Sequence, residues 1–225
     1  MFKATIDADI LKSSIETLSV LVDEARFRIS TEGLSVRAVD PANVAMVSFE
    51  LAASAFNDFA ADDCEIGMDL TKVNDIFGVA EKNEKATLEL DELSQKMSIH
   101  IGGFSYTLSL LDPSTIRAEP RIPQLELPAE VVLNGKELQK AVKAAEKISD
   151  HMSLGVDGDI FYMEAEGDTD KVRLEMPRDQ LIDLRSGEAR SLFSLDYLSD
   201  IVKPASRSNE VTLELGKDYP IKIGF

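Results

Sequence analysis

The sequence contains few of the side chains that carry most enzyme and metal chemistry: one cysteine, two histidines and no tryptophan among 225 residues. The single cysteine, Cys64, cannot form a disulfide within the chain, and it lacks the second cysteine that zinc sites use. His100 and His151 are far apart and stand in no recognisable catalytic motif with Ser, Cys or Asp. We therefore predict a non-enzymatic protein without a metal or other cofactor, in which both histidines are structural.

The chain also lacks long apolar runs and an excess of positive charge. No run approaches the roughly 18 apolar residues needed to cross a bilayer, and the opening MFKATIDADI does not have the pattern of a secretion signal. The 41 acidic side chains outnumber the 24 basic ones, which gives a net charge of -17. A protein this acidic does not coat nucleic acid with its whole surface. We expect a soluble cytoplasmic protein whose contact with DNA, if any, is confined to one region.

Against this acidic background, lysines recur at helical spacing between Asn134 and Asp150. The four are Lys136, Lys140, Lys143 and Lys147. At about 3.6 residues per turn, they fall within a stripe roughly 60° wide, and the apolar side chains of the segment lie opposite. One face of this predicted helix would pack on the protein while the other presents positive charge. The alternative is an ordinary solvated helix face, the usual reason for charge on a surface helix.

The two halves of the chain show the same pattern. Thr-Leu-Glu-Leu at 87–90 reappears at 212–215, and Asp-Ile at 75–76 reappears at 200–201, both with an offset of 125 residues. In the first half, apolar patterning predicts strands at 2–6, 26–30, 34–39, 44–51, 87–90, 96–101 and 105–111, with helices from residue 9 and over 71–79. The second half predicts strands at 131–133, 152–156, 160–165 and 171–176, the lysine helix, a helix over 195–203 and a closing strand pair. A duplicated fold explains both observations.

The duplication predicts the domain boundaries. We assign an N-terminal domain to residues 1–111, a connecting segment with four prolines to residues 112–128, and a C-terminal domain to residues 129–225. The offset would place the counterpart of the strand at 105–111 beyond Phe225. We therefore expect the C-terminal domain to lack this strand within the given chain, as it would if the chain were truncated.

One pair of carboxylates has the spacing of a cation site. Asp168 and Asp170 stand at i and i+2, where they could bind a divalent ion. A metal-dependent hydrolase using this pair is one hypothesis. Gly167 and these aspartates are also typical of a turn between strands, which is the interpretation we favour.

Several segments resemble a known family. The stretch LSVRAVDPANVAMVSFEL at 34–51 is similar to the sliding clamps of archaeal and eukaryotic DNA replication, the proliferating cell nuclear antigen family, and most similar to the archaeal members. The opening Met1-Phe2-Lys3-Ala4, the helix end at 21–25, the stretch FSLDYL at 193–198 and the closing 211–223 carry the same resemblance. It covers essentially the entire chain.

The resemblance implies an α+β fold with two similar domains, each with antiparallel sheets outside and two helices inside, closed as a homotrimeric ring around duplex DNA. It implies a processivity factor that tethers polymerase, clamp loader, flap endonuclease and ligase through short peptide motifs in replication and repair, in the cytoplasm and on the nucleoid. The side chains that would face DNA are Lys12, Lys72, Lys136, Lys140, Lys143, Lys147 and Lys203. The first half is poorer in cations, with Asp75 and Gly78 where relatives often carry lysines.

The resemblance also implies two protein-binding surfaces. Partner peptides would bind a pocket formed by Val39, Val44, Met46, Ile122, Pro123, Leu125 and Pro220. Subunits would pair residues 104–111 of one copy with residues 171–177 of the next, through Phe104, Tyr106, Leu108, Lys171 and Arg173. The rival to a DNA clamp is an acidic adaptor of the same fold that binds proteins and does not encircle DNA.

Overall fold

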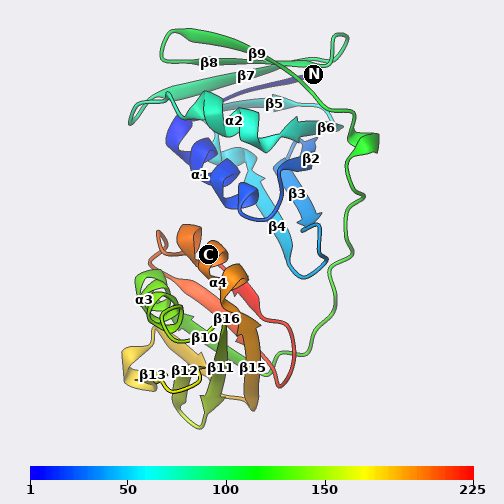
Figure 1. Ribbon diagram of the computed structural model, residues 1–225. Coiled ribbons are helices and arrows are strands. Elements are labelled where there is room, and N and C mark those ends of the chain that lie inside the picture. Colours follow the sequence, from blue (N-terminus) through cyan, green and yellow to red (C-terminus); the bar gives the residue numbers. More distant parts are fainter. The chain divides into compact units, whose positions relative to one another are not determined.

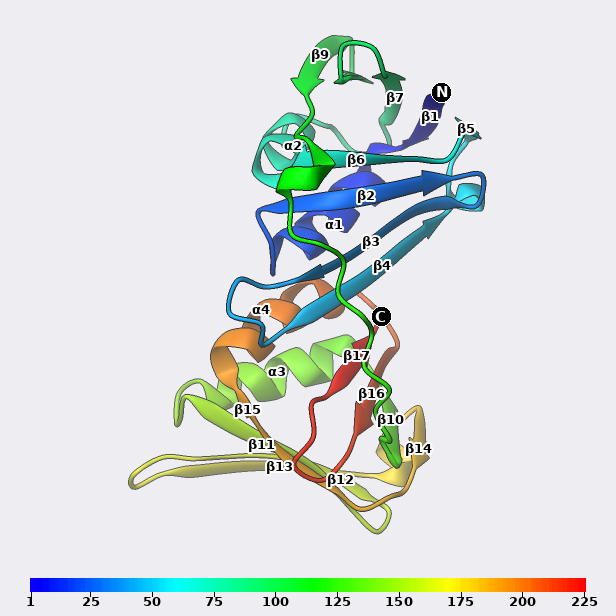
Figure 2. The same ribbon diagram turned by 90° about the vertical axis from the view of Figure 1, so that its right-hand side faces the viewer.

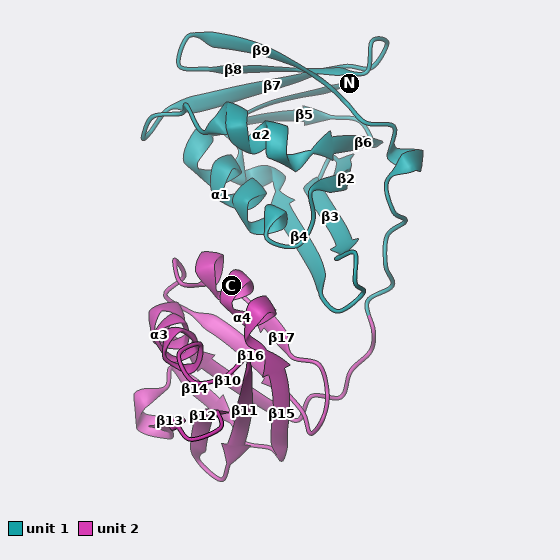
Figure 3. Ribbon diagram, viewed as in Figure 1, with its two compact units in different colours: residues 1–122 teal, residues 123–225 magenta.

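The computed structural model describes all 225 residues, which form two compact units, Met1–Ile122 and Pro123–Phe225 (Figure 3). Both units combine antiparallel sheets with two α-helices (Figure 1), which is the predicted α+β class. The division falls within the proline-containing segment 112–128 that we assigned to the connection. None of the helices is both long and apolar enough to span a membrane.

Unit 1 has two sheets of antiparallel strands, ordered β5-β1-β7-β8-β9 and β4-β3-β2-β6. Along β1, alternate residues Phe2, Ala4 and Ile6 are buried, because successive side chains of a strand point to opposite faces. The strands are β1 (Phe2–Asp7), β2 (Glu24–Ser30), β3 (Gly33–Val39), β4 (Met46–Ala52), β5 (Asp58–Ala61), β6 (Cys64–Asp69), β7 (Lys85–Asp91), β8 (Lys96–Ile101) and β9 (Phe104–Ser109), and the helices are α1 (Ala8–Ser19) and α2 (Leu70–Phe77).

The two helices of unit 1 pack side by side over the core. Leu11, Ile15 and Leu18 of α1 are buried, as the helical spacing predicts, and Val73 and Phe77 of α2 join the same hydrophobic cluster. A hydrogen bond from the Asn74 side-chain amide to the Ser19 hydroxyl (2.7 Å) links the helices.

Unit 2 has the sheets β14-β10-β16-β17 and β13-β12-β11-β15, again antiparallel throughout. Its strands are β10 (Ala129–Leu133), β11 (His151–Asp157), β12 (Ile160–Glu166), β13 (Lys171–Pro177), β14 (Asp183–Arg185), β15 (Ala189–Ser194), β16 (Val211–Leu215) and β17 (Lys222–Gly224). Its helices are α3 (Gly135–Ala145) and α4 (Leu195–Ala205), which pack against each other. The Gln139 amide donates to the Ser206 hydroxyl (3.2 Å) just beyond the end of α4.

The two units repeat one arrangement, as the offset of 125 residues predicted. Each begins strand, helix, five strands, helix, two strands, and each sheet order of unit 2 matches one of unit 1. The exception is β9, which adds a fifth strand to its sheet and has no counterpart in unit 2.

The structure departs from the sequence analysis in two respects. Four strands were missed, namely β5, β6, β14 and β15. Three of them are short or contain glycine, so they show little alternation of apolar and polar residues. The lysine helix also ends earlier than its apolar pattern suggested, at Ala145, and Lys147 lies in the turn that follows.

Candidate nucleic-acid and partner interfaces

Helix α3 separates apolar from basic side chains. Leu138, Ala141, Val142 and Ala145 are buried in the core of unit 2. The Asn134 side chain accepts a hydrogen bond from the Lys136 N–H (3.0 Å), which caps the first turn of the helix. Because one side of α3 is fixed against the sheet, the direction in which the opposite side faces is fixed too.

The predicted lysines occupy the exposed side of this helix and the turn after it. All four are exposed, and Lys136, Lys143 and Lys147 make no ion pair within the chain. Lys140 lies 3.9 Å from Glu137, and both side chains are well exposed, so this pair neutralises little of the charge. The result is a row of cations that are available to an external anion.

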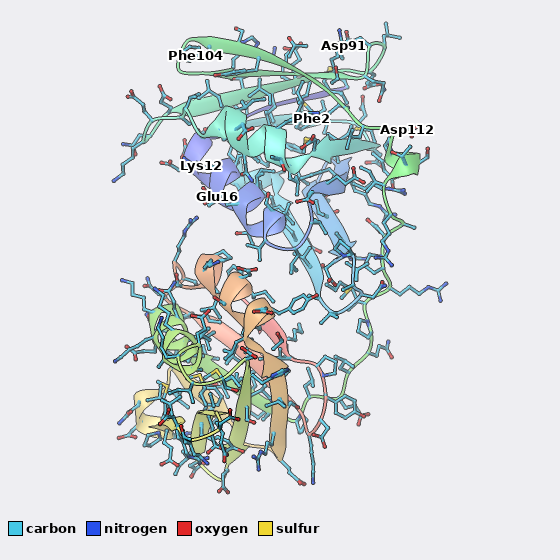
Figure 4. All side chains as sticks on the ribbon, in the orientation of Figure 1. Phe2, Lys12, Glu16, Asp91, Phe104 and Asp112 are labelled. Carbon is cyan, nitrogen blue, oxygen red and sulfur yellow. The ribbon has the colours of Figure 1, made fainter.

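The three other predicted DNA-facing lysines have acidic neighbours. Lys203 on α4 lies 2.7 Å from Asp200, whose carboxylate raises the pKa of the lysine. Lys72 on α2 lies 3.0 Å from Asp69, the residue that caps that helix. Lys12 is half-buried on α1, one turn before Glu16 (Figure 4). The positive surface of the helices is therefore concentrated on unit 2.

Four of the seven predicted peptide-binding residues belong to unit 1 and three to unit 2, and none of the seven is buried. In unit 1, Val39 and Met46 are half-buried and face each other across the end of the β3–β4 ladder. Val44, in the turn between them, is 66% exposed, and Ile122 is 50% exposed. In unit 2, Leu125 is half-buried, while Pro123 and Pro220 are exposed. None of these apolar side chains lies in the core of its unit, so each is accessible to a partner.

The first part of the connecting segment is attached to unit 1. It runs along the face of the β4-β3-β2-β6 sheet (Figure 2), and the Arg26 guanidinium on β2 donates to the carbonyls of Pro113 (2.5 Å) and Ile116 (3.0 Å). Further on, Glu119 lies 3.0 Å from Arg28. We call residues 112–119 the strap.

Two strands that were predicted to join subunits lie at sheet edges. β9 ends the five-stranded sheet of unit 1, and β13 ends a four-stranded sheet of unit 2, so each has a row of unpaired backbone groups. On β9, Phe104 is 59% exposed and its ring lies 6.2 Å from that of Tyr106. Leu108 needs a correction, because it is only 7% exposed and packs in the core of its own unit. It is therefore unsuited to contact a second subunit.

Beside the β13 edge lies a charged cluster that sequence reasoning missed. Glu164 on β12 is nearly buried and lies 3.0 Å from both Lys171 and Arg173 and 3.9 Å from Arg190. Hydrogen bonds from Arg173, and after it from Lys171, lower the pKa of the Glu164 carboxyl. The Arg173 guanidinium also stacks on the ring of Tyr162, 4.1 Å from its centroid. Lys171 and Arg173, proposed as interface residues, are thus held in place by their own chain.

The Asp168–Asp170 pair lies in the turn between β12 and β13. The Gly167 N–H donates to the Asp170 carbonyl (2.9 Å), as expected for the turn that we favoured. The chain contains no group of three or more His, Cys, Asp or Glu side chains arranged to hold a metal ion. The geometry gives the hydrolase hypothesis no support.

Comparison with known proteins agrees with this architecture. Two family models match, the N-terminal domain of proliferating cell nuclear antigen over residues 1–103 and its C-terminal domain over residues 121–225. The DNA polymerase sliding clamps of Methanococcoides burtonii and Methanosarcina mazei are 75% and 68% identical over 225 residues, which is all of this chain and 92% of each relative.

Solved structures show the same fold. One, described as the C-terminal region of FEN-1 bound to A. fulgidus PCNA, has a TM-score of 0.95 and 38% identity, and the match covers 99% of this chain and 91% of that one. Another, PCNA from Thermococcus kodakaraensis, has a TM-score of 0.93 and 27% identity, with 99% and 93% covered. Since both family models match and together span most of the sequence, this chain belongs to the proliferating cell nuclear antigen family, the sliding clamps of DNA polymerase.

Proposed function

We propose that three copies of this sliding clamp close into a ring around duplex DNA, with the helices of each copy facing the DNA. The observation that carries the proposal is the basic face of α3 in a chain of net charge -17. A sheet-backed helix with exposed, unpaired lysines is suited to contact phosphates, which carry no sequence information. Acidic side chains elsewhere would repel other nucleic acid.

Such a surface holds DNA weakly when the ring is open. Each phosphate that a lysine neutralises changes the logarithm of affinity by about 0.9 per logarithm of salt concentration. A few such contacts are too weak to keep an enzyme on its template at physiological salt. Retention must then come from topological closure of the ring, which leaves the clamp free to slide.

The two units contribute unequally to this contact. The lysines of α3 and its following turn are mostly unpaired, while Lys72 and Lys203 are each paired with an aspartate. We infer that unit 2 supplies most of the attraction to the duplex, and that unit 1 mainly completes the ring.

The joint between subunits would form where β9 of one copy pairs with β13 of the next. Both are edge strands, and a head-to-tail contact between two different edges generates a closed ring when the rotation between copies is right. Phe104 and Tyr106 would supply apolar contact, while Lys171 and Arg173 would supply charge.

The clamp would act as a scaffold and not as an enzyme. A relative binds the C-terminal region of FEN-1, and we infer that Val39, Val44, Met46, Ile122, Pro123, Leu125 and Pro220 bind similar peptides of polymerase, clamp loader, flap endonuclease and ligase. Its place would be on chromosomal DNA in the cytoplasm. The rival, an adaptor of the same fold that does not encircle DNA, predicts partner binding without retention on closed circles.

Loading onto nicked circular plasmid tests encirclement. A clamp placed on the circle by a clamp loader should survive salt that removes it from linear duplex, and cutting the plasmid should release it, because its hold is topological. Gel filtration of labelled clamp with plasmid measures retention. Equal retention on circular and linear DNA would contradict the ring.

Paired charge reversals test the unequal contribution of the units. Lys140→Glu with Lys143→Glu should reduce the salt slope of binding to linear duplex by about two, since each lost phosphate contact removes about 0.9. The matched control, Lys12→Glu with Lys72→Glu, should change the slope less. Fluorescence anisotropy across salt concentrations gives both slopes, and an equal or larger loss in the control pair would place the contact on unit 1.

Substitutions at the two edges test the subunit joint. Arg173→Glu on β13 should weaken trimerisation, and so should Phe104→Ser on β9, which removes an exposed ring without opening the core. Arg121→Glu, at an exposed arginine with no ion pair, serves as the charge control. Sedimentation at micromolar concentration measures the mass. A trimer of unchanged stability in both edge variants would refute the assignment.

The charged cluster beside β13 predicts a pH dependence. Its cations lower the pKa of Glu164 in the folded state, so the stability it contributes is present above the unfolded value of about 4.3 and disappears as pH falls through the lower folded value. Glu164→Gln should therefore lower the unfolding midpoint at pH 7, and the difference from wild type should shrink from about pH 5 downward. Thermal circular dichroism at several pH values measures it. A difference that stays constant down to pH 3 would show that the cluster does not act through charge.

A further inference from the structure

The turn between β3 and β4, which carries the exposed Val44, is built on one carboxylate. Asp40 is 4% exposed, and its two oxygens accept hydrogen bonds from the N–H groups of Ala42 (3.0 Å), Val44 (2.7 Å) and Ala45 (2.8 Å). The backbone closes the same turn, with the Asp40 N–H donating to the Ala45 carbonyl (3.0 Å). The turn therefore has a defined shape before any partner arrives.

A second side chain holds this turn from outside. The Arg117 guanidinium donates to the Asp40 carbonyl (3.1 Å) through Nη1 and to the Asn43 side-chain oxygen (2.5 Å) through Nη2. Asn43 has a φ of 61°, in the left-handed region, where its short side chain is better tolerated than most. Both acceptors lie on the turn, and the donor comes from the strap, more than 70 residues later in the chain.

The position of Arg117 is itself fixed by the residue before it. Ile116 is 6% exposed, and its Cδ1 packs closely on Gly67 of β6. A Cβ added at residue 67 would lie only 2.7 Å from this Cδ1 atom. The Ile116 carbonyl also accepts the hydrogen bond from Arg26 on β2. By contrast, Arg121–Gln124 further along the segment are exposed. The anchored strap thus ends shortly before Ile122, the next proposed pocket residue.

We propose that Arg117 is a positioning residue for partner-peptide binding: it joins the β3–β4 turn to the connecting segment, and so presents the turn's exposed Val44 and the segment's Ile122 in the conformation that a peptide binds. This inference rests on the proposed peptide pocket. Arg117 itself need not touch the peptide. Its effect is pre-organisation, because a turn and a segment that are already ordered lose less conformational freedom on binding.

The interaction is open to a double-mutant cycle. Arg117→Gln removes the charged fork, and Asn43→Gly removes the side-chain acceptor while keeping a residue that accommodates positive φ. Arg117→Gln, which removes both bonds to the turn, should weaken binding of a synthetic peptide that copies the C-terminal region of a flap endonuclease by about fivefold, and Asn43→Gly, which removes one of them, should weaken it by no more than that. The double variant should bind no more weakly than Arg117→Gln alone, because Arg117→Gln already removes the bond to Asn43 together with the bond to the Asp40 carbonyl.

Controls separate positioning from general damage. Lys82→Gln makes the same change of charge at an exposed residue that has no ion pair, and it should bind the peptide as wild type does. In Arg117→Gln the amides of Val44 and Ala45 should exchange hydrogen faster while the unfolding midpoint and trimer mass stay unchanged. Titration calorimetry and hydrogen exchange supply these values.

The outcomes distinguish this inference from the proposed pocket. If wild type does not bind the peptide, or if Val44→Glu binds it as well as wild type does, the pocket is wrong and the role of Arg117 fails with it. If wild type binds and Val44→Glu does not, but Arg117→Gln binds within twofold of wild type or its effect adds to that of Asn43→Gly, the pocket stands and the positioning role is overturned.

Discussion

The functional surface depends on the packing of one helix against one sheet. Leu138, Val142 and Ala145 anchor α3 in the core of unit 2, and this burial fixes the direction of the lysines on its other side. Lysine side chains on a surface are flexible, so the position of their charge depends on how firmly the helix backbone that carries them is fixed. In a chain of net charge -17, this direction decides which surface can attract an anion. The row on α3 is the local exception in an acidic molecule.

Duplication of the fold has produced two units with the same elements and different surfaces. Each has a helix pair over its core, but the exposed lysines without an ion pair that lie on a helix or in the turn directly after it, Lys136, Lys143 and Lys147, belong to unit 2. The edges of the sheets differ as well: unit 1 offers β9, with exposed Phe104, and unit 2 offers β13, with Arg173 held between Glu164 and the ring of Tyr162. Two unlike edges on one chain allow head-to-tail assembly, which a pair of identical edges would not.

Prediction from sequence worked where side chains follow a period. Of the apolar side chains at helical spacing along α1, Leu11, Ile15 and Leu18 are buried as predicted, while Ile10 is 37% exposed. The 125-residue offset correctly predicted the repeated order of elements. It failed for β14, whose three residues are too few to show alternation. Leu108 was wrongly assigned to the subunit interface. Phe104 and Leu108 lie on the same strand, but only the fold shows that Phe104 is exposed while Leu108 is buried in the core of unit 1.

Contacts between distant residues lay beyond sequence reasoning. The strands predicted at 34–39 and 44–51 leave a short turn between them, but nothing in the sequence pairs Asn43 of this turn with Arg117, which follows 74 residues later. The same holds for Arg190 and Glu164, which are brought together only by the sheet. Sequence reasoning could thus find the individual segments of the candidate site. The hydrogen bonds and ion pairs between distant segments could be identified only from the three-dimensional structure.

The central claim is that the lysine face of α3 points at enclosed DNA, while the exposed face of the β13-β12-β11-β15 sheet of unit 2 does not. A photoreactive amino acid can replace Lys140 on α3 or, separately, Leu192, which is 65% exposed on the side of β15 that faces away from the core. After loading onto closed circular duplex and irradiation, the position 140 protein should crosslink to DNA, and the position 192 protein should not. Crosslinking from position 192 at an equal or higher yield would contradict the account, because the lysine face would then not be the one that meets the duplex.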